Sequence, residues 1–228
     1  VSGVRGIIGE SLTPEVIVNM AAAFGTYING KKIIVGGDSR VSGPFVRKIV
    51  TGTLTALGYH VVDIGITPTP TVQLMVETLD ADGGIAITAS HNPIQWNGLK
   101  FIGHDGLFLP EENIKEMFTI SDRNEFKYPG YKNLGEIELY SDALTDHLKL
   151  IYKLSYIQPK LIKEKEFTVV LDSVNGAGGP IMTQLLEDLG CKVIGLNIEP
   201  TGVFAHIPEP LPENLTQLSE AVIKENAD

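Results

Sequence analysis

A serine and a histidine stand side by side at the end of an apolar run, in the stretch Gly84-Ile-Ala-Ile-Thr-Ala-Ser-His-Asn-Pro93. A hydroxyl beside an imidazole could perform nucleophilic catalysis, with the serine attacking and the histidine taking its proton. Neighbouring residues on an extended chain point to opposite sides, however, so His91 is badly placed to act as the base of Ser90. The stretch also lacks the Gly-x-Ser-x-Gly pattern of a hydrolase elbow. A serine hydrolase is therefore kept as an alternative rather than as the main hypothesis.

The place of this stretch in the chain favours a ligand-binding loop over a plain polar turn. Asn92-Pro93 would end a strand in either case. In an open α/β sheet, ligands bind just outside the carboxyl ends of the strands, and this loop begins at such an end. It concentrates hydroxyls, an imidazole and an amide, and Lys100 follows ten residues after Ser90. From spacing alone, a polar turn without a ligand stays open as the alternative.

The elements that must position this loop follow from the apolar pattern. Short β-branched runs alternate with amphipathic segments, which is typical of an α/β fold with a mixed, mostly parallel sheet. Thr13-Pro14 has the residue types of a helix N-cap and first helical position, and Gly58 suits a C-terminal cap. We expect a three-layer α/β/α domain at residues 1–135, with strands at 4–8, 32–36, 60–64, 84–88 and 99–102 and helices at about 14–28, 44–57 and 70–79.

A second, incomplete α/β domain of the same type is expected at residues 136–228. It begins with a connecting helix at about residues 141–154. Strands at residues 167–171 and 192–196, with a helix from Pro180 to near Gly190 between them, predict a βαβ unit. A last helix is expected at about residues 215–225, and Asn226-Ala-Asp228 then turns toward a further strand. The sequence thus predicts one complete domain followed by part of another.

Composition narrows the class of protein. The 228 residues are 43% hydrophobic, which is enough for a core that needs no disulfides or metals. The formal net charge of −10 argues against a general nucleic-acid binder, which needs a basic surface. The lone Cys191 cannot form an intramolecular disulfide, and no apolar run approaches the roughly 20 residues of a membrane span. We therefore expect a cytoplasmic protein that binds neither nucleic acid nor a membrane.

The motif Thr88-Ala-Ser-His-Asn-Pro93, with Asn97-Gly98 and Lys100 downstream, closely resembles the phosphoserine loop of the α-D-phosphohexomutase superfamily. This superfamily includes phosphoglucomutases, phosphomannomutases and phosphoglucosamine mutases. The resemblance extends along nearly the whole chain, as an amino-terminal portion of such enzymes. Further matching segments are Ser2-Gly-Val-Arg-Gly6, Val35-Gly-Gly-Asp-Ser-Arg40, Leu171-Asp-Ser-Val-Asn-Gly-Ala177 and Glu209-Pro-Leu-Pro-Glu-Asn-Leu215.

The resemblance implies an isomerase that moves phosphate between the C1 and C6 oxygens of a hexose. In this intramolecular phosphotransferase reaction, Ser90 would pass a phosphoryl group to a sugar monophosphate, and the resulting bisphosphate would reorient and return its other phosphate. A phosphoserine carries about two negative charges near neutral pH, so it needs cations and fixed donors around it. Arg5 and Lys100 match the phosphoryl-facing cations of the family.

The remaining roles also come from the resemblance. His91 and Asn92 would shape the loop or hold oxygens of the ligand and the phosphoserine, so His91 joins the catalytic group without being the base. Asn92 and Asn97 would bind substrate or phosphate. One Mg²⁺ per active site is implied for the full-length enzyme, bound through phosphorylated Ser90, with a sugar bisphosphate as activator. The family's other metal ligands form an Asp-x-Asp-x-Asp loop, which we expect beyond Asp228.

One loop departs from the family pattern. The turn after the second strand usually reads Gly-Arg-Asp, whereas Gly37 stands here in place of the arginine. This weakens any phosphate contact from the loop, and Asp38 and Arg40 are interpreted as a structural ion pair. His206 has no partner at metal-ligand spacing and is interpreted as a surface or packing residue.

Four functions stay open within these limits, and the serine hydrolase named above is one of them. The sequence favours an enzyme of the phosphomannomutase/phosphoglucomutase type, with phosphoglucosamine mutase as the alternative in the same superfamily. A non-catalytic module that binds sugar phosphates is the alternative from a different class. The full-length protein is expected to be a monomer or homodimer acting on a phosphosugar. This chain alone is expected to be inactive because it lacks the metal loop.

Overall fold

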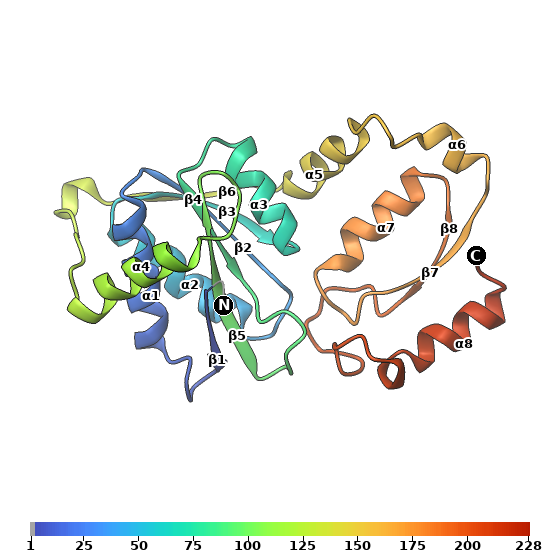
Figure 1. Cartoon of the computed structure of the whole chain (residues 1–228), viewed down its shortest axis with the longest axis horizontal. Coiled ribbons are helices and arrows are strands. Elements are labelled where there is room, and N and C mark those ends of the chain that lie inside the picture. The colour runs from blue at the N-terminus through green and yellow to red at the C-terminus, as the bar shows by residue number, and fades with distance from the viewer. Residues whose placement is uncertain (1–2) are drawn as a thin grey trace. The chain divides into compact units, whose positions relative to one another are not determined.

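The computed structural model describes residues 3–228, so Val1 and Ser2, the first residue of the segment Ser2-Gly-Val-Arg-Gly6, lie outside the described residues. The chain forms two compact units, traced in Figure 1. Unit 1 contains the residues up to Asp38 together with Ser42–Ala89 and Gln95–Ala143. Unit 2 contains Ser39–Val41, Ser90–Ile94 and Leu144–Asp228. Two short loop segments therefore group with the carboxyl-terminal part of the chain.

A six-stranded mixed sheet forms the centre of unit 1, in the order β1-β5-β4-β2-β3-β6. The strands β4, β2, β3 and β6 run parallel to one another, whereas β5 runs antiparallel to both β1 and β4. The predicted mixed, mostly parallel sheet is thus confirmed. The strand bounds are β1 Gly3–Ile7, β2 Lys32–Gly37, β3 His60–Ile66, β4 Gly83–Ile87, β5 Trp96–Gly103 and β6 Glu136–Leu139.

Helices cover both faces of this sheet. Consecutive residues of β2 show the alternation that a pleated strand imposes, because Ile33 and Val35 enter one core cluster and Ile34 enters the other. The first cluster includes residues of α1, α2 and α4, and the second includes residues of α3. This arrangement confirms the predicted three-layer α/β/α architecture (Figure 1). The helix bounds are α1 Pro14–Ile28, α2 Gly43–Ala56, α3 Thr69–Thr78 and α4 Glu111–Arg123.

Local signals explain where several elements begin and end. The Thr13 hydroxyl accepts a hydrogen bond from the Val16 amide over 3.5 Å, and α1 starts at Pro14 as its cap predicts. Asn29 ends α1 in the left-handed region at φ 49°, a conformation that asparagine tolerates. Gly58 follows α2 with φ 91°, in keeping with the expected glycine cap. The helix α4 and the strand β6 were not among the expected elements.

Unit 2 contains a parallel two-stranded sheet of β7 and β8, paired in register from Thr168↔Lys192 to Asp172↔Leu196. The helix α7 lies between these strands in sequence, so the predicted β-α-β succession is observed. The other elements are α5, whose first residue still belongs to unit 1, α6, and α8. Their bounds are α5 Ala143–Tyr152, α6 Pro159–Lys163, β7 Thr168–Asp172, α7 Gly178–Asp188, β8 Lys192–Leu196 and α8 Thr216–Glu225, with 3-10 turns at Tyr131–Asn133 and Pro212–Asn214.

The linking segment joins the first sheet before the second unit begins. The strand β6 pairs with β3, with His60↔Glu136 as the first partners. The domain border expected between residues 135 and 136 remains a prediction. In this part of the chain, the first compact unit ends at Ala143 and the second continues from Leu144. Within residues 3–228, every helix is too short or too polar to cross a membrane.

Candidate active site

The parallel strands β2 and β4 are neighbours and end side by side. Ser90 follows shortly after the end of β4. The amide of Asp38, directly after β2, donates to the carbonyl of Ile87 at the end of β4 over 2.9 Å. The hydroxyl of Thr88 donates in turn to the Asp38 carboxylate over 2.5 Å. The amide of Thr88 is held by the Gly98 carbonyl at 3.0 Å. The carboxyl end of β4 is thus fixed by hydrogen bonds on both sides, and the chain runs from it through Ala89 into the Ser90–Ile94 loop.

Ser90 is exposed and takes a left-handed backbone conformation, with φ 56°. This conformation costs a residue other than glycine about 1–2 kcal/mol, and such strain is found preferentially at functional sites. Its hydroxyl lies 3.4 Å from Nδ1 of His91. That separation is longer than the ~2.6–3.2 Å at which a base takes a proton from its nucleophile. The expectation that His91 is not the base of Ser90 stays a prediction.

A buried arginine that sequence analysis had not placed at the site holds this loop. Arg40 donates to the carbonyls of Ser90, Asn92 and Pro93 over 2.9, 2.7 and 2.7 Å. Its sequence position, in the turn after β2, gave a signal for an ion pair with Asp38 rather than for contacts to a distant loop. Asn92 is half-buried in the same loop, and it meets Arg40 through its backbone carbonyl.

Arg5 and Lys100 lie on the neighbouring antiparallel pair of strands in unit 1. Gly3 faces Lys100 across β1 and β5, and Arg5 faces Gly98. Because side chains alternate along a strand, Arg5 and Lys100 extend from the same face of the pair, at diagonal positions. Arg5 is exposed and Lys100 is half-buried. The two expected cations are therefore brought together by the register of β1 on β5.

The pKa of Lys100 is lowered in this position. Burial is the main cause, the positive charge of Arg5 adds to it, and the negative charge of Asp38 opposes it. The Lys100 ammonium also lies 5.5 Å from the ring centroid of Phe108, within cation–π range. A cation that is partly desolvated and held among fixed charges is suited to an anionic group such as a phosphoryl.

Asn97 lies inside the protein, where its side chain binds protein groups. It is fully buried. Its amide group donates to the Ser42 hydroxyl over 2.9 Å, and its carbonyl oxygen accepts from the Gly98 amide over 2.8 Å. Both ends of the side chain are thereby occupied. The ligand contact expected for Asn97 stays a prediction, while the observed contacts hold the start of β5 against the turn before α2.

Metal ligands are scarce in the part of the chain that the structure describes. Among residues 3–228, no three or more histidine, cysteine, aspartate or glutamate side chains are grouped so that they could hold a metal ion. Ser90 alone could give one oxygen, through a phosphate, whereas Mg²⁺ takes about six oxygen ligands. These residues therefore do not form a magnesium site by themselves, and none of the steps below is assigned to a metal.

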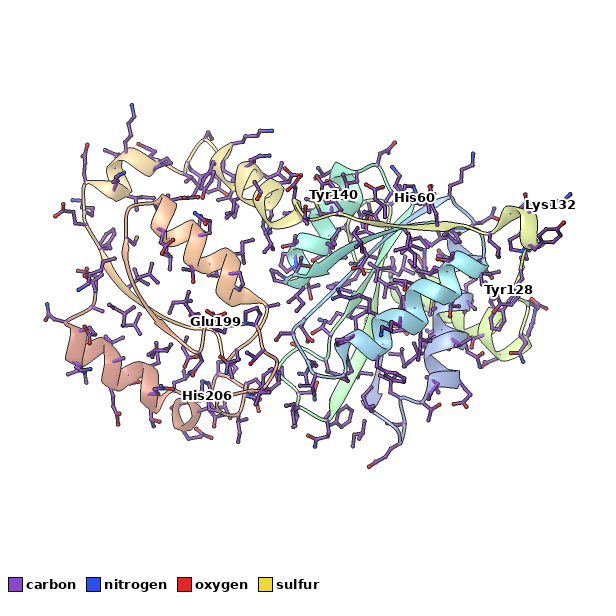
Figure 2. All side chains as sticks on the ribbon, turned by 180° about the vertical axis from the view of Figure 1, so that it is seen from behind. His60, Tyr128, Lys132, Tyr140, Glu199 and His206 are labelled. Atoms are coloured by element: carbon purple, nitrogen blue, oxygen red, sulfur yellow. The ribbon has the colours of Figure 1, made fainter. Side chains whose placement is uncertain are left out.

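The second unit carries a separate polar cluster at the end of β7. The Asp172 carboxylate contacts Nε2 of His206 over 3.0 Å and accepts hydrogen bonds from the Val174 amide and the Asn197 side chain. Nδ1 of His206, labelled in Figure 2, lies 2.9 Å from the Ile207 carbonyl. His206 thus has two protein partners, and its interpretation as a surface or packing residue stays a prediction.

Comparison with known proteins decides the family. The model of phosphoglucomutase/phosphomannomutase α/β/α domain I matches residues 1–128, and the model of domain II of the same family matches residues 139–228. The chain belongs to the phosphoglucomutase/phosphomannomutase family. The resemblance of the phosphoserine-loop motif to the phosphohexomutases is confirmed by these matches.

Individual phosphohexomutases match the chain over its whole length. A Pyrococcus abyssi protein named "Probable phosphoglucosamine mutase" is 36% identical over 233 residues, covering 100% of this chain and 49% of the relative. A Thermococcus kodakarensis protein named "Phosphoglucomutase/phosphomannomutase" is 37% identical over 235 residues, covering 99% and 50%. The crystal structure of a family protein from Burkholderia thailandensis superposes with a TM-score of 0.86 at 27% identity, covering 100% and 50%. The chain spans about half the length of the curated relatives it matches.

Proposed function

We propose that the protein to which this chain belongs is a phosphohexomutase that interconverts hexose 1-phosphate and hexose 6-phosphate. The observation that carries the proposal is the exposed Ser90 hydroxyl, held in a left-handed conformation just beyond the carboxyl end of β4. This is the edge of an α/β sheet at which ligands bind. Membership of the phosphoglucomutase/phosphomannomutase family supports a phosphoryl carrier at this position over a hydrolytic nucleophile.

In the proposed cycle, phosphorylated Ser90 donates its phosphoryl group to the free hydroxyl of a hexose monophosphate. The bond between phosphorus and the Ser90 oxygen breaks, a bond to the sugar oxygen forms, and the sugar's hydroxyl proton ends on Ser90. The bisphosphate reorients, and its other phosphate returns to Ser90 by the reverse chemistry. Phosphoryl transfer depends mainly on positioning and on neutralising charge, which we assign to Arg5 and Lys100.

The other residues of the loop have supporting roles in this proposal. His91 and Asn92 shape the loop or bind oxygens of the phosphoserine and the ligand. Asn97 is kept as a further candidate for binding substrate or phosphate, although its side chain has protein partners at both ends. When bound, Mg²⁺ would neutralise phosphoryl oxygens, and phosphorylated Ser90 is the residue of this chain proposed to contact it.

Mass spectrometry of the intact full-length protein tests the proposal. Incubation with a hexose bisphosphate should add one phosphoryl group of about 80 Da to Ser90. The Ser90→Ala variant should show no adduct, whereas Ser155→Ala, which removes an exposed serine elsewhere, should be labelled like the wild type. Absence of any adduct on the wild type would favour a non-catalytic sugar-phosphate-binding module. Reaction of Ser90 with a fluorophosphonate probe would instead favour the serine hydrolase.

Two substrate types fit the proposal, and relatives named for both types match the chain. The relatives are named as phosphoglucosamine mutases and as a phosphoglucomutase/phosphomannomutase. We place the phosphomannomutase/phosphoglucomutase type first and phosphoglucosamine mutase second. Coupled assays with mannose 1-phosphate, glucose 1-phosphate and glucosamine 6-phosphate distinguish them, with a sugar bisphosphate as activator. This chain alone should turn over none of the three.

The remaining parts of the proposal concern organisation and place in the cell. We propose phosphohexomutase domain I at residues 1–135 and part of domain II at residues 136–228. The full-length protein is proposed to be a cytoplasmic monomer or homodimer without nucleic-acid or membrane partners. Light scattering on the purified full-length protein measures the oligomeric state, and cell fractionation tests the location.

A further inference from the structure

Arg40 is a fully buried charged residue whose guanidinium donates hydrogen bonds to the Ser90–Ile94 loop and also lies 5.0 Å from the ring centroid of Phe204. Its side chain has no exposed surface. Nη1 donates to the Pro93 carbonyl, and Nη2 donates to the carbonyls of Ser90 and Asn92. Three of the four peptide carbonyls between Ser90 and Pro93 are thus bound by one side chain. Arg40 and the Ser90–Ile94 loop also fall into the same compact unit.

These contacts constrain the loop where its backbone needs support. Ser90 is held in a left-handed conformation that residues other than glycine rarely adopt. A strained conformation persists when its surroundings over-determine it. Arg40 does this with a planar fork of donors, which fixes both the distances and the directions of the bound carbonyls. The loop follows β4, and Arg40 follows β2, the parallel neighbour of β4. The donor and the acceptors of these hydrogen bonds therefore come after the ends of two adjacent strands.

We propose that Arg40 is a positioning residue for phosphoryl transfer, which acts by holding the Ser90 loop in the orientation that presents its hydroxyl or phosphate. The role rests on the proposed function of Ser90 as the phosphoryl carrier. Transfer requires the reacting oxygen and phosphorus to be aligned, and misplacement by about 1 Å can cost on the order of 100-fold in rate. Arg40 lies behind the loop and binds its backbone, so it is distinct from the phosphoryl-facing cations Arg5 and Lys100.

The Arg40→Lys variant of the full-length protein separates geometry from charge. Lysine keeps the positive charge but lacks the fork that can bind three carbonyls at once. We expect kcat to fall about 100-fold or more, with KM for the hexose phosphate within about threefold, because the loop rather than the sugar site is disturbed. Arg40→Met, which removes the charge as well, should be at least as impaired. Full activity in Arg40→Lys with loss in Arg40→Met would show that charge alone matters and would overturn the positioning role.

Arg47 offers a matched control on α2. Its guanidinium also binds a carbonyl, that of Gly65 at 2.8 Å, and lies 3.4 Å from the Asp63 carboxylate. Arg47→Lys should therefore lose a similar type of contact while keeping kcat within about threefold of the wild type. Added ethylguanidine should restore part of the kcat of Arg40→Ala and leave that of Arg47→Ala unchanged. A purely structural loss at Arg40 predicts equal behaviour of the two pairs, and that result would overturn the proposal.

Two readouts do not depend on catalysis. Hydrogen exchange of the amides of His91, Asn92, Ile94 and Gln95 should quicken in Arg40→Lys and stay as in the wild type in Arg47→Lys. Fluorescence of Trp96, the single tryptophan of the chain, should change in the first variant alone. In the wild type, slow exchange of the Arg40 guanidinium protons tests the carbonyl contacts even where variants fold poorly; fast exchange would overturn them. If the wild type forms no phosphoserine yet the loop readouts respond to Arg40→Lys, the proposed function fails and the loop-holding role stands.

Discussion

Arg5 and Lys100 lie at diagonal positions across the antiparallel pair β1–β5, on the same face of the sheet. Two cations so placed repel each other, and an anion bound between them would stabilise both charges. The negative charge of the Asp38 carboxylate also acts on Lys100. That carboxylate accepts a hydrogen bond from Thr88 at the end of β4. The strand register thus gathers charges of both signs near the Lys100 ammonium, and their balance can be measured.

Changing either neighbour should move the pKa of Lys100 in a known direction. Arg5→Gln removes a like charge, so the pKa of Lys100 should rise toward its ordinary value while burial keeps it below. Asp38→Asn removes an opposite charge, so the same pKa should fall further. The pH dependence of reductive methylation at Lys100, followed by NMR, measures both shifts. Lys115, which is exposed on α4, serves as the control, and equal shifts in one direction for both variants would contradict the prediction.

The Asn97–Ser42 hydrogen bond should contribute to stability through buried partners. Asn97→Ala removes bonds to the Ser42 hydroxyl and the Gly98 amide and should lower the free energy of unfolding by about 1–3 kcal/mol. Ser42→Ala should cost less, and the double variant should show a coupling energy of about 0.5–1.5 kcal/mol. Urea denaturation measures these values. Asn133→Ala, at an exposed turn, should change the same free energy by less than about 0.5 kcal/mol, and strict additivity of the first two substitutions would exclude a direct bond.

Tyr59 connects the end of α1 with the following turn through one hydroxyl. It donates to the Gly25 carbonyl over 2.6 Å and accepts from the Gly30 amide over 2.9 Å. Tyr59→Phe keeps the ring but leaves both backbone groups unbound, so we expect a loss of about 1–3 kcal/mol in the free energy of unfolding. Thermal unfolding followed by circular dichroism tests this. The matched change Tyr131→Phe, at a side chain that is 82% exposed, should leave the melting temperature within about 1 °C.

The Asp172–His206 pair should make the stability of the second unit depend on pH. Burial lowers the pKa of His206, but hydrogen bonds to the Ile207 carbonyl and to Asp172, with the Asp172 charge, outweigh it and raise that pKa. A pKa that is raised in the folded state stabilises the fold fully at pH values below the unfolded-state pKa of about 6.5. This stabilisation is lost as the pH rises through the folded-state pKa. The difference in unfolding free energy between wild type and His206→Gln should therefore shrink as the pH rises, from on the order of 1 kcal/mol at acidic pH.

NMR titration of the histidine rings provides the internal contrast for that pair. Burial lowers the pKa of His147, so His147 and His206 should titrate on opposite sides of the ordinary histidine value. A His206 ring that titrates below His147 would contradict the assignment of its two partners.

Several elements of unit 1 could be predicted because their signals are local. The Thr13-Pro14 start of α1, the glycine after α2 and the apolar run of β4 each lie within a few residues of the feature they determine. The strand order could not be predicted in the same way. β5 returns beside β4, the strand before it in the chain, but its pairing with β1 joins residues far apart in sequence, and no local pattern encodes that pairing.

The site shows the same division between local and distant causes. Ser90, Arg5 and Lys100 stand in motifs that can be read in one stretch each. Arg40 is buried against the Ser90 loop, and Asn97 is buried beside Ser42. Both contacts join segments that come together only in the folded protein. Polar residues of these types usually lie on the surface, so their sequence gives no sign of burial. The exposed strand β6 was missed although Glu136-Ile-Glu-Leu139 alternates polar and apolar residues, because the run is only four residues long and its pairing partner β3 is distant in sequence.

The pairing of β1 with β5 sets the order in which the site can be assembled during synthesis. Gly3 has its partner in Lys100, so the first strand of this sheet in chain order can pair only after one of its last strands has been made. Such a sequence-distant contact is slow to form and is closed late. Arg5 therefore takes its place beside Lys100 after β2, β3 and β4 have left the ribosome. The same pairing that joins β1 to the sheet therefore also brings Arg5 and Lys100 together.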